Sequence, residues 1–394
     1  MNLPTRRIVL VLALLTLAFV LCPSARAWGC EGHQIVAYVA EAHLTPRARA
    51  KALKILSASP IDPRLSRYCQ PVSRDPFVDA STWADDFRSQ HPETRPWHYI
   101  DIPRGARKGP LAPYCPPASG CVVSALQAQL RILKNAKSSA TDRADALRFM
   151  IHFVGDIHQP LHAVTNNDEG ANCVPVEFFG ELPKETNAER ESFEPNLHWV
   201  WDVGLIDHLD NRGASPQPDS QAGPPNAVRR PGSAAFQPSE PETTRLAATI
   251  DRQLRARISV WQSQPVDFAA WAWESHALAD SVAYGKLPHP IPIEPPRSIN
   301  SCADDNHVAL RMLRLNENLG AAYESAAAPV VQQQLAKAGA RLAALLNSLW
   351  PRANNLRSSS RTQPRRLRMG VRDLLLISRV PHSSLCSVRE GCGF

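Results

Sequence analysis

The pattern of apolar and polar positions predicts a chain made mainly of helices. Apolar residues recur every three or four positions in several stretches, as in helices with one buried face. Two such stretches lie at residues 32–56 and are joined at Thr45-Pro46, where Thr45 can cap a helix that Pro46 begins. The same pattern predicts helices at about residues 121–137, 142–157, 243–262, 266–284, 303–324 and 328–349. Because no repeat of about 20 to 50 residues is visible, we expect one all-α domain rather than a repeat array.

The segments between these stretches lack the helical pattern. Residues 97–102, WHYIDI, are short and aromatic and predict an extended segment, and a loop rich in Pro and Gly follows at about residues 103–120. Residues 163–195 predict a loop region in which VPVEFF, at residues 174–179, forms a strand of a small hairpin. Residues 211–242 are rich in Pro, Ser, Gly and Ala, which predicts a mobile surface insertion.

The first 27 residues have the features of a secretory signal peptide. Two arginines precede an apolar run at residues 8–21, and ARA at residues 25–27 matches a cleavage site, so Trp28 would become the first residue. A lipoprotein leader acylated at Cys22 is the weaker alternative, because a bulky leucine precedes that cysteine. The run is short for a transmembrane anchor, and no later stretch could span a bilayer. We therefore expect a secreted or periplasmic monomer without a membrane anchor.

Charge is distributed unevenly along the 394 residues. The formal net charge is +7, but the last segment, residues 351–394, alone carries +7 and the signal peptide carries +3. The domain at residues 28–350 is therefore mildly acidic, and its charge gives no argument for nucleic-acid binding. The arginine-rich tail has few core-forming residues, which predicts disorder. We expect it to be a solvated extension; the alternative is an electrostatic tether to nucleic acid or anionic surfaces.

Eight cysteines remain after signal-peptide removal, and an exported protein can form disulfides from them. Cys115 and Cys121 enclose the short loop CPPASGC and are the best candidate pair, while spacing leaves the other pairings open. No CxxC pair suggests a thiolate zinc site, so a metal site here should use histidines and carboxylates. The eight are Cys30, Cys69, Cys115, Cys121, Cys173, Cys302, Cys386 and Cys392.

Two histidine–aspartate pairs are the strongest chemical signal. His152 and Asp156 are four residues apart inside the apolar run RFMIHFVGDIHQPLH, so both would lie on one face of a helix that Pro160 ends. NLHWVWD repeats the spacing with His198 and Asp202. One such pair is more often structural than metal-binding. Two pairs in apolar surroundings favour metal, because buried ionisable groups are costly unless they are paired or coordinate an ion.

Six motifs resemble, in order, those of the single-strand-specific S-one/P-one nucleases, a family related to bacterial zinc-dependent phospholipase C. The motifs are WGCEGH, STWADDFR, WHYID, RFMIHFVGDIHQPLH, NLHWVWD and WAWESHALA. The resemblance covers about residues 28–350 apart from the Pro-rich insertion. It implies a mainly helical fold with three zinc ions in a cleft.

The resemblance also implies a set of metal ligands. One zinc ion would be held by Asp85, His98, His152 and Asp156, a second by His162, His198 and Asp202, and a third by the amine and carbonyl of Trp28, by His33 and by Asp156 as a bridge. Imidazole and carboxylate suit zinc, and open positions would remain for water and substrate. The freed amine as a ligand would make signal-peptide cleavage a step in activation.

The activity implied is that of an exported endonuclease and 3′-nucleotidase. Such an enzyme hydrolyses phosphodiester bonds of single-stranded DNA and RNA to 5′-phosphate products. Asp85, Asp156 and Arg88 would be the catalytic residues, with Arg88 clamping the phosphate. The structural alternative for Arg88 is a surface salt bridge to Asp85 or Asp86.

Substrate binding would depend on Tyr99, Asp101 and Asn172. An aromatic face stacks on any base and a carboxylate accepts from base amino groups, which suits unstacked nucleic acid. Tyr99 could instead be a core aromatic. The family's asparagine follows two glycines, whereas Asn172 follows Gly170 and Ala171, so base preference at this position is open.

Two other activities compete with a nuclease. A phospholipase C would share the zinc ligands but lack the base platform, and a non-catalytic zinc-stabilised binding protein would need no open ligand position. His276 in ESHALA is expected to support the site rather than bind metal. Fungal members of the family join the segment after WHYID to the ALA helix by a long disulfide. Asp280 stands where the second cysteine would be, so this bridge should be absent.

Overall fold

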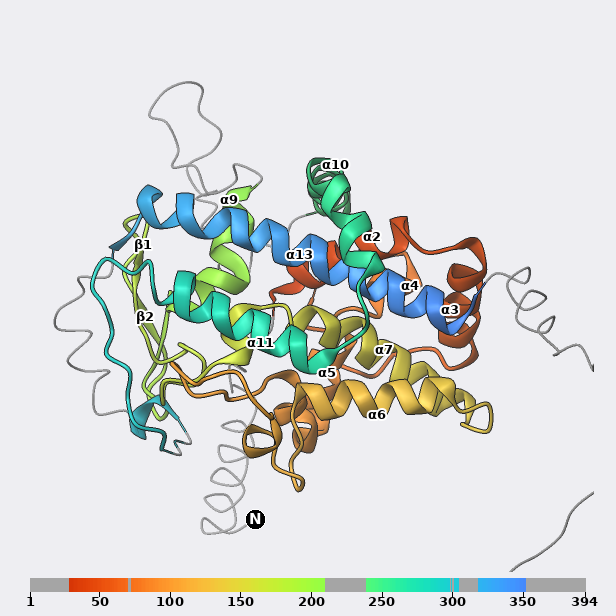
Figure 1. Cartoon of the computed structure of the whole chain (residues 1–394), viewed down its shortest axis with the longest axis horizontal. Coiled ribbons are helices and arrows are strands. Elements are labelled where there is room, and N and C mark those ends of the chain that lie inside the picture. Colours follow the sequence, from red (N-terminus) through yellow and green to blue (C-terminus); the bar gives the residue numbers. More distant parts are fainter. Residues whose placement is uncertain are drawn as a thin grey trace, which may run out of the picture. The chain divides into compact units, whose positions relative to one another are not determined.

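The structure is a computed structural model, and the part of the chain that it describes is mainly helical (Figure 1). This confirms the predicted fold class. The predicted signal peptide, almost all of the Pro-rich insertion and the arginine-rich tail lie outside the described residues, so what the sequence predicts for them stays a prediction. The described residues are 28–69, 72–209, 239–297, 299, 301–304 and 318–351, all within the first of two units, residues 1–352.

The N-terminal helix pair forms as the sequence predicted. Helix α2 (Cys30–Ala42) is followed by α3 (Pro46–Ala58), and the Thr45 hydroxyl accepts a hydrogen bond from the main-chain nitrogen of Ala48 at 3.2 Å. Helix α2 packs against the long C-terminal helix α13 (Ala321–Leu349). Gly339 makes this approach possible, because a Cβ atom there would lie 2.7 Å from Val39.

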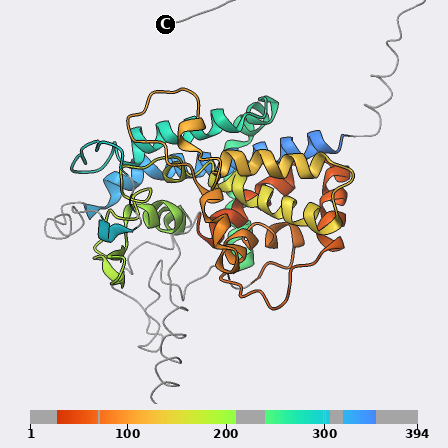
Figure 2. The same ribbon diagram turned by 90° about the horizontal axis from the view of Figure 1, so that it is seen from below.

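Helix α7 (Ala140–Asp156) runs through the middle of the domain. Its N-terminus is capped by the Ser139 hydroxyl, and its last eleven residues are buried, because α3, α6 (Val122–Lys134) and α13 pack around it (Figures 1 and 2). A helix surrounded in this way needs apolar residues on every side, which explains the run RFMIHFV. Ionisable residues in this part of α7 are therefore placed in the core.

Two more long helices complete the helical body. Helix α10 (Glu240–Ser263) begins with a capping box of Ser239 and Glu242 and packs on α2 and α13. Helix α11 (Phe268–Leu278) continues into a π-helical turn, Ala279–Ala283, and runs beside α13 in both views (Figures 1 and 2). Both were predicted. The remaining helical elements are α4 (Pro76–Asp79), α5 (Trp83–Gln90), α8 (Leu197–Trp199), a π-helical turn (Val200–Gly204), α9 (Leu205–Leu209) and the 3-10 turns Pro92–His98, Ala112–Tyr114, Pro160–Ala163 and Cys302–Asp304.

The boundaries of two predicted elements were wrong. Residues 97–102 were predicted to be extended, but Trp97 and His98 end the 3-10 turn Pro92–His98, and only Tyr99 onward is extended. Helix α7 ends at Asp156, one residue from the end predicted by its apolar pattern, but three residues before Gln159, where Pro160 was expected to end it. Pro160 instead begins the 3-10 turn Pro160–Ala163, since proline fits the first position of a helical turn.

The predicted hairpin is formed by other residues. Within VPVEFF, strand β1 (Glu177–Phe178) pairs in parallel with β4 (Asn318–Leu319), and the hairpin consists of β2 (Lys184–Asn187) and β3 (Ser192–Glu194). Residues 303–324 were predicted to be one helix. In the described part of that range, a 3-10 turn ends at Asp304 and β4 is at Asn318–Leu319, so the prediction was wrong for these residues; residues 321–324 are helical but begin α13.

Three disulfides link the described residues. Cys115–Cys121 was predicted, and Cys30–Cys69 and Cys173–Cys302 are the pairings that spacing left open. Cys386 and Cys392 lie outside the described residues. None of the helices in the described ranges is long and apolar enough to cross a membrane.

Candidate metal centre

The structure brings the predicted side-chain ligands together in three groups. Within each group the ligand atoms lie within 4.8 Å of one another. Helix α7 is the centre of this arrangement, because two of the groups include His152 and one also includes Asp156. The groups are His33, His152 and Asp156; Asp85, His98 and His152; and His162, His198 and Asp202.

Asp156 lies between ligands from different elements. Its Oδ2 is 3.3 Å from His152 Nε2 and 3.1 Å from His98 Nδ1, whereas its Oδ1 is 3.4 Å from His33 Nε2 and 3.8 Å from His162 Nδ1. The two carboxylate oxygens therefore face different histidines. A carboxylate placed in this way can bridge two cations.

Asp85 completes the second group, which also contains His98 and His152. Its Oδ1 lies 3.6 Å from His152 Nε2 and 3.7 Å from His98 Nδ1. Asp85 is in the first turn of α5, and His98 ends the 3-10 turn Pro92–His98. Both short elements pack directly on α7, which explains how residues far apart in sequence meet.

The second histidine–aspartate pair has the predicted geometry. His198 Nε2 is 3.0 Å from Asp202 Oδ2, and the His162 ring lies 5.0 Å from the His198 ring. Asn196 caps the short helix α8 that carries His198, accepting from the nitrogen of Trp199 at 2.8 Å. Asp202 lies in the π-helical turn Val200–Gly204, a type of distortion common at functional sites.

Main-chain carbonyls set the orientation of three of these histidines. His152 Nδ1 lies 2.6 Å from Ser81 O, His162 Nδ1 lies 2.9 Å from His98 O, and His198 Nδ1 lies 2.6 Å from Gly170 O. A carbonyl oxygen only accepts, so in each case Nδ1 carries the proton and donates it. The lone pair is then on Nε2, which faces the other ligands, as in metal sites whose outer hydrogen bonds orient the ligands.

The N-terminal segment of the described chain lies against α7. The Trp28 indole is fully buried and donates to Gly155 O at 2.9 Å, and Gly29 N donates to Asp202 O at 2.9 Å. A Cβ atom at Gly155 would lie 2.8 Å from His33 Nδ1, so glycine allows His33 to reach Asp156. The residues before Trp28 are outside the described part, and the amine of Trp28 as a ligand stays a prediction.

The chemistry of the buried groups fits a metal ion. Both oxygens of Asp156, both ring nitrogens of His33 and Nε2 of His162 are buried without a hydrogen-bond partner among the described residues. Unsatisfied buried polar atoms are costly, and bound cations would satisfy the two carboxylate oxygens and the lone-pair nitrogen of each imidazole. Burial lowers the pKa of His33, His98 and His162 well below the usual value. These imidazoles are therefore neutral, which is the form that binds metal.

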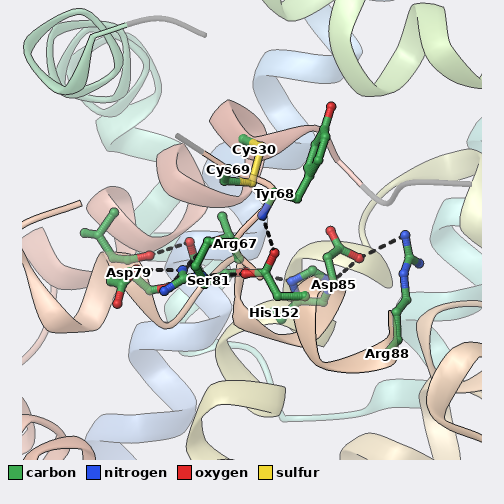
Figure 3. Close-up of a disulfide and its surroundings, with 12 residues drawn as sticks. Cys30, Arg67, Tyr68, Cys69, Asp79, Ser81, Asp85, Arg88 and His152 are labelled. Carbon is green, nitrogen blue, oxygen red and sulfur yellow. Dashed lines mark hydrogen bonds and ion pairs between the residues drawn. A yellow bond between two sulfur atoms is a disulfide. The ribbon is translucent and has the colours of Figure 1, made fainter. Parts of the chain in front are cut away.

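Arg88 is a buried neighbour of this centre rather than a surface residue. It is 6% exposed, and its Nη2 lies 3.2 Å from Asp85 Oδ1 (Figure 3). Its positive charge adds to burial in lowering the pKa of His98. Asp86, the other proposed partner, is instead paired with Arg67 at 2.6 Å.

The predicted base-binding residues lie beside the centre. Tyr99 directly follows His98 and is 39% exposed, so it is not a core aromatic. Asp101 is also exposed to solvent, and both residues feel the charge of Glu169. Asn172 is half-buried, and its side-chain amide donates to Glu169 O at 2.7 Å. All three residues therefore lie near Glu169.

Sequence reasoning missed the residues that hold the ligands in place. Gln159 is fully buried and donates to Asp202, and the carbonyls of Ser81 and Gly170 orient two histidines. Of these, only Gln159 could have been found from the sequence, because a polar side chain in the apolar run between Asp156 and His162 needs a hydrogen-bond partner.

Residues 28–351 match the family described as S1/P1 Nuclease. The chain belongs to the S1/P1 nuclease family. The match covers most of the chain and includes every candidate ligand, and it agrees with the resemblance seen in the six motifs.

Known proteins similar to this S1/P1 family member are named as nucleases. Endonuclease 2 of Arabidopsis thaliana is 32% identical over 194 residues, 47% of this chain and 58% of that protein. Nuclease P1 of Penicillium citrinum is 30% identical over 191 residues, 46% of this chain and 59% of that protein. The chain thus spans less than two thirds of the length of these two relatives. Endonuclease 4 of Arabidopsis thaliana is 26% identical over 337 residues, 83% of this chain and 90% of that protein.

Proposed function

We propose that this protein is a zinc-dependent endonuclease and 3′-nucleotidase. It hydrolyses phosphodiester bonds of single-stranded DNA and RNA and leaves 5′-phosphate products. The placement of Asp156 carries the proposal, because its two oxygens face histidines from different groups in a chain that belongs to the S1/P1 nuclease family. A cluster of cations would stabilise a buried carboxylate that is shared in this way.

Three zinc ions would be held by the residues of the centre. The first would bind Asp85, His98, His152 and Asp156, the second His162, His198 and Asp202, and the third Trp28, His33 and Asp156. The donor set of imidazoles and carboxylates supports zinc over magnesium or calcium, which prefer oxygen ligands alone. Zinc bound here supplies Lewis acidity, which makes water nucleophilic near neutral pH and stabilises negative charge on the phosphate.

The protein's own residues then position the phosphodiester. Arg88 has a fixed place beside Asp85, from which its guanidinium can donate two hydrogen bonds to phosphate oxygens. These donors stabilise the charge that develops on the phosphate during hydrolysis. Asp85 and Asp156 both approach Nε2 of His152, at 3.6 Å and 3.3 Å, and as ligands they would fix where the attacking water and the phosphate bind.

The base platform supports the choice of single strands. Tyr99 offers an exposed ring on which one base can stack, and Asp101 and Asn172 can hydrogen-bond its edge. A base can reach such a platform only when it is unpaired, since a duplex keeps its bases stacked inside. Duplex DNA should therefore be a poor substrate.

We infer that the protein acts outside the cytoplasm. The predicted signal peptide and three disulfides in the described residues support export to an oxidising compartment. Cleavage before Trp28 would also free the amine proposed as a ligand.

The test is hydrolysis of denatured DNA, RNA, duplex DNA and phosphatidylcholine by the mature protein. We expect single-stranded nucleic acids to be cleaved, EDTA to abolish cleavage, and added zinc to restore it. Cleavage of phosphatidylcholine alone would support a phospholipase C instead. Cleavage that is unaffected by EDTA would contradict the metal mechanism, and bound zinc without hydrolysis of any substrate would indicate a binding protein.

A further inference from the structure

One fully buried side chain outside the ligand set touches the candidate centre. Gln159 lies between Asp156 and His162 and has no exposed surface. Its side-chain nitrogen donates to Asp202 Oδ1 at 2.6 Å, and its side-chain oxygen accepts from Leu161 N at 2.5 Å. Both ends of the amide are therefore engaged.

The orientation of this amide is fixed by its partners. The main-chain nitrogen of Leu161 can only donate, and an ionised carboxylate such as that of Asp202 can only accept. Glutamine is the side chain of this length that offers one acceptor and one donor. Glutamate has the same shape but would have no proton to give to Asp202 at neutral pH.

The main chain of Gln159 is connected to the same centre. Its nitrogen donates to Asp156 O at 3.0 Å, and its carbonyl oxygen accepts from His162 N at 3.1 Å. Through its main chain and side chain, Gln159 thus contacts three proposed ligands that belong to three different elements.

The hydrogen bond to Asp202 determines which carboxylate oxygen remains available. Oδ1 is taken by Gln159, while Oδ2 lies 3.0 Å from His198 Nε2. Without the donor, Asp202 could rotate and expose either oxygen, so the pair with His198 would be less well defined.

We propose that Gln159 is a positioning residue that directs Oδ2 of Asp202 toward the metal ion shared with His162 and His198. This inference rests on the proposed function, because it assumes that the third ligand group binds an ion. Gln159 contacts no substrate and is not a ligand. Its effect is on metal affinity at one of the three sites.

Two substitutions separate this role from general packing. Gln159→Glu keeps the shape and the acceptor for Leu161 but removes the donor to Asp202, and Gln159→Met removes both hydrogen bonds. Gln334→Met is the matched control, because Gln334 is also fully buried and donates at 2.7 Å to a main-chain carbonyl, that of His158, without touching a proposed ligand.

The measurements are zinc content by elemental analysis, zinc affinity by competition with a chromophoric chelator, and the rise in Tm on adding zinc. For both Gln159 variants we expect the weakest-bound zinc ion to lose about 10- to 100-fold in affinity, the range typical for residues that orient ligands. The zinc concentration for half-maximal cleavage of denatured DNA should rise by a similar factor. Gln334→Met should lower the Tm of the metal-free protein but leave zinc affinity unchanged.

The outcomes distinguish this inference from the proposed function. If the wild-type protein binds zinc and cleaves DNA while Gln159→Glu binds zinc with unchanged affinity, the positioning role is wrong and the function stands. The same conclusion follows if Gln334→Met loses as much zinc affinity as the Gln159 variants. If the wild-type protein binds no zinc, both proposals are wrong. If Gln159→Met fails to fold, the zinc affinity of Gln159→Glu, which keeps the shape of the side chain, still tests the positioning role.

Discussion

Arg104 and Asp280 form an ion pair that joins two distant segments of the chain. Arg104 Nε donates to Asp280 Oδ1 at 3.1 Å, and Gly105 N donates to Oδ2 at 3.0 Å. The guanidinium also lies 4.5 Å from the centre of the Tyr284 ring. Asp280 stands where the second cysteine of a long disulfide is expected in fungal members of the family. In this chain, hydrogen bonds and an ion pair connect the segment after Ile102 to the π-helical turn that follows α11.

Replacing Asp280 with alanine should therefore lower stability. The change leaves Arg104 Nε and Gly105 N without their acceptor, and Arg104 is only 11% exposed. Because Asp280 is 31% exposed, solvent screens the pair, and we expect a loss of about 1 kcal/mol in the free energy of unfolding. Urea unfolding monitored by circular dichroism measures this.

Asp62→Ala is the control for this prediction. Asp62 pairs with Arg64 only two residues away, and that pair is exposed, so its loss should have almost no effect. If both variants unfolded at the urea concentration of the wild-type protein, the ion pair at Asp280 would not contribute to stability.

Asp156→Asn should abolish most of the activity. The amide keeps the shape of the carboxylate but removes the charge that two of the proposed zinc ions share, so both should bind more weakly. We expect cleavage of denatured DNA to fall by about 100-fold or more, with less zinc per protein by elemental analysis. Asp251→Asn, which alters an ion pair with His43 away from the centre, should retain both activity and zinc. Near-normal turnover of Asp156→Asn would argue against a shared ligand.

The two histidine–aspartate pairs of the centre could be predicted from sequence because their spacing is local, whereas Asp85, His98 and His33 were assigned only from the resemblance to the family. His152 and Asp156, like His198 and Asp202, are four residues apart in apolar surroundings, and helical geometry places each pair on one face. The acceptors that orient the histidines could not be predicted. Ser81 O and Gly170 O are main-chain atoms, and their positions depend on how separate elements pack.

Long-range pairing explains the errors in the fold. Most of the long helices were predicted, because each is specified by its own apolar face and caps. Strand β1 pairs with β4, about 140 residues later, and nothing within VPVEFF identifies that partner. The pairing Cys173–Cys302 was hidden for the same reason, since spacing alone does not determine disulfide connectivity.

Asp101 should make base binding depend on pH. Asp101 is exposed at the surface, but the protein packed around its carboxyl group and the nearby carboxylates of Asp168 and Glu169 raise its pKa to about 7. A raised pKa means that the carboxyl takes up its proton as the pH falls through 7, and it then no longer accepts from base amino groups. We expect the KM for an adenine oligonucleotide to rise about threefold to tenfold between about pH 8 and pH 6.

A uracil oligonucleotide is the internal control for the pH effect. Uracil has no exocyclic amino group, so the KM ratio of the two substrates isolates Asp101 from other titrating groups. In Asp101→Asn this ratio should become independent of pH. If the KM ratio of the two substrates changed with pH in Asp101→Asn as it does in the wild-type protein, Asp101 would not be the acceptor.

An extra residue before Trp28 should damage the third proposed zinc site. The Trp28 indole is fixed by its hydrogen bond to Gly155 O, and Gly29 N is held by Asp202 O, so the start of the mature chain has little freedom to move aside. An added glycine would convert the amine into an amide nitrogen, which is a poor metal ligand. We expect zinc at His33 and Asp156 to bind about 10-fold or more weakly and cleavage of denatured DNA to fall in parallel. The same glycine added at the C-terminus should change neither zinc affinity nor the rate of cleavage. If the N-terminal variant kept three zinc ions and the wild-type rate, the amine of Trp28 would not be a ligand.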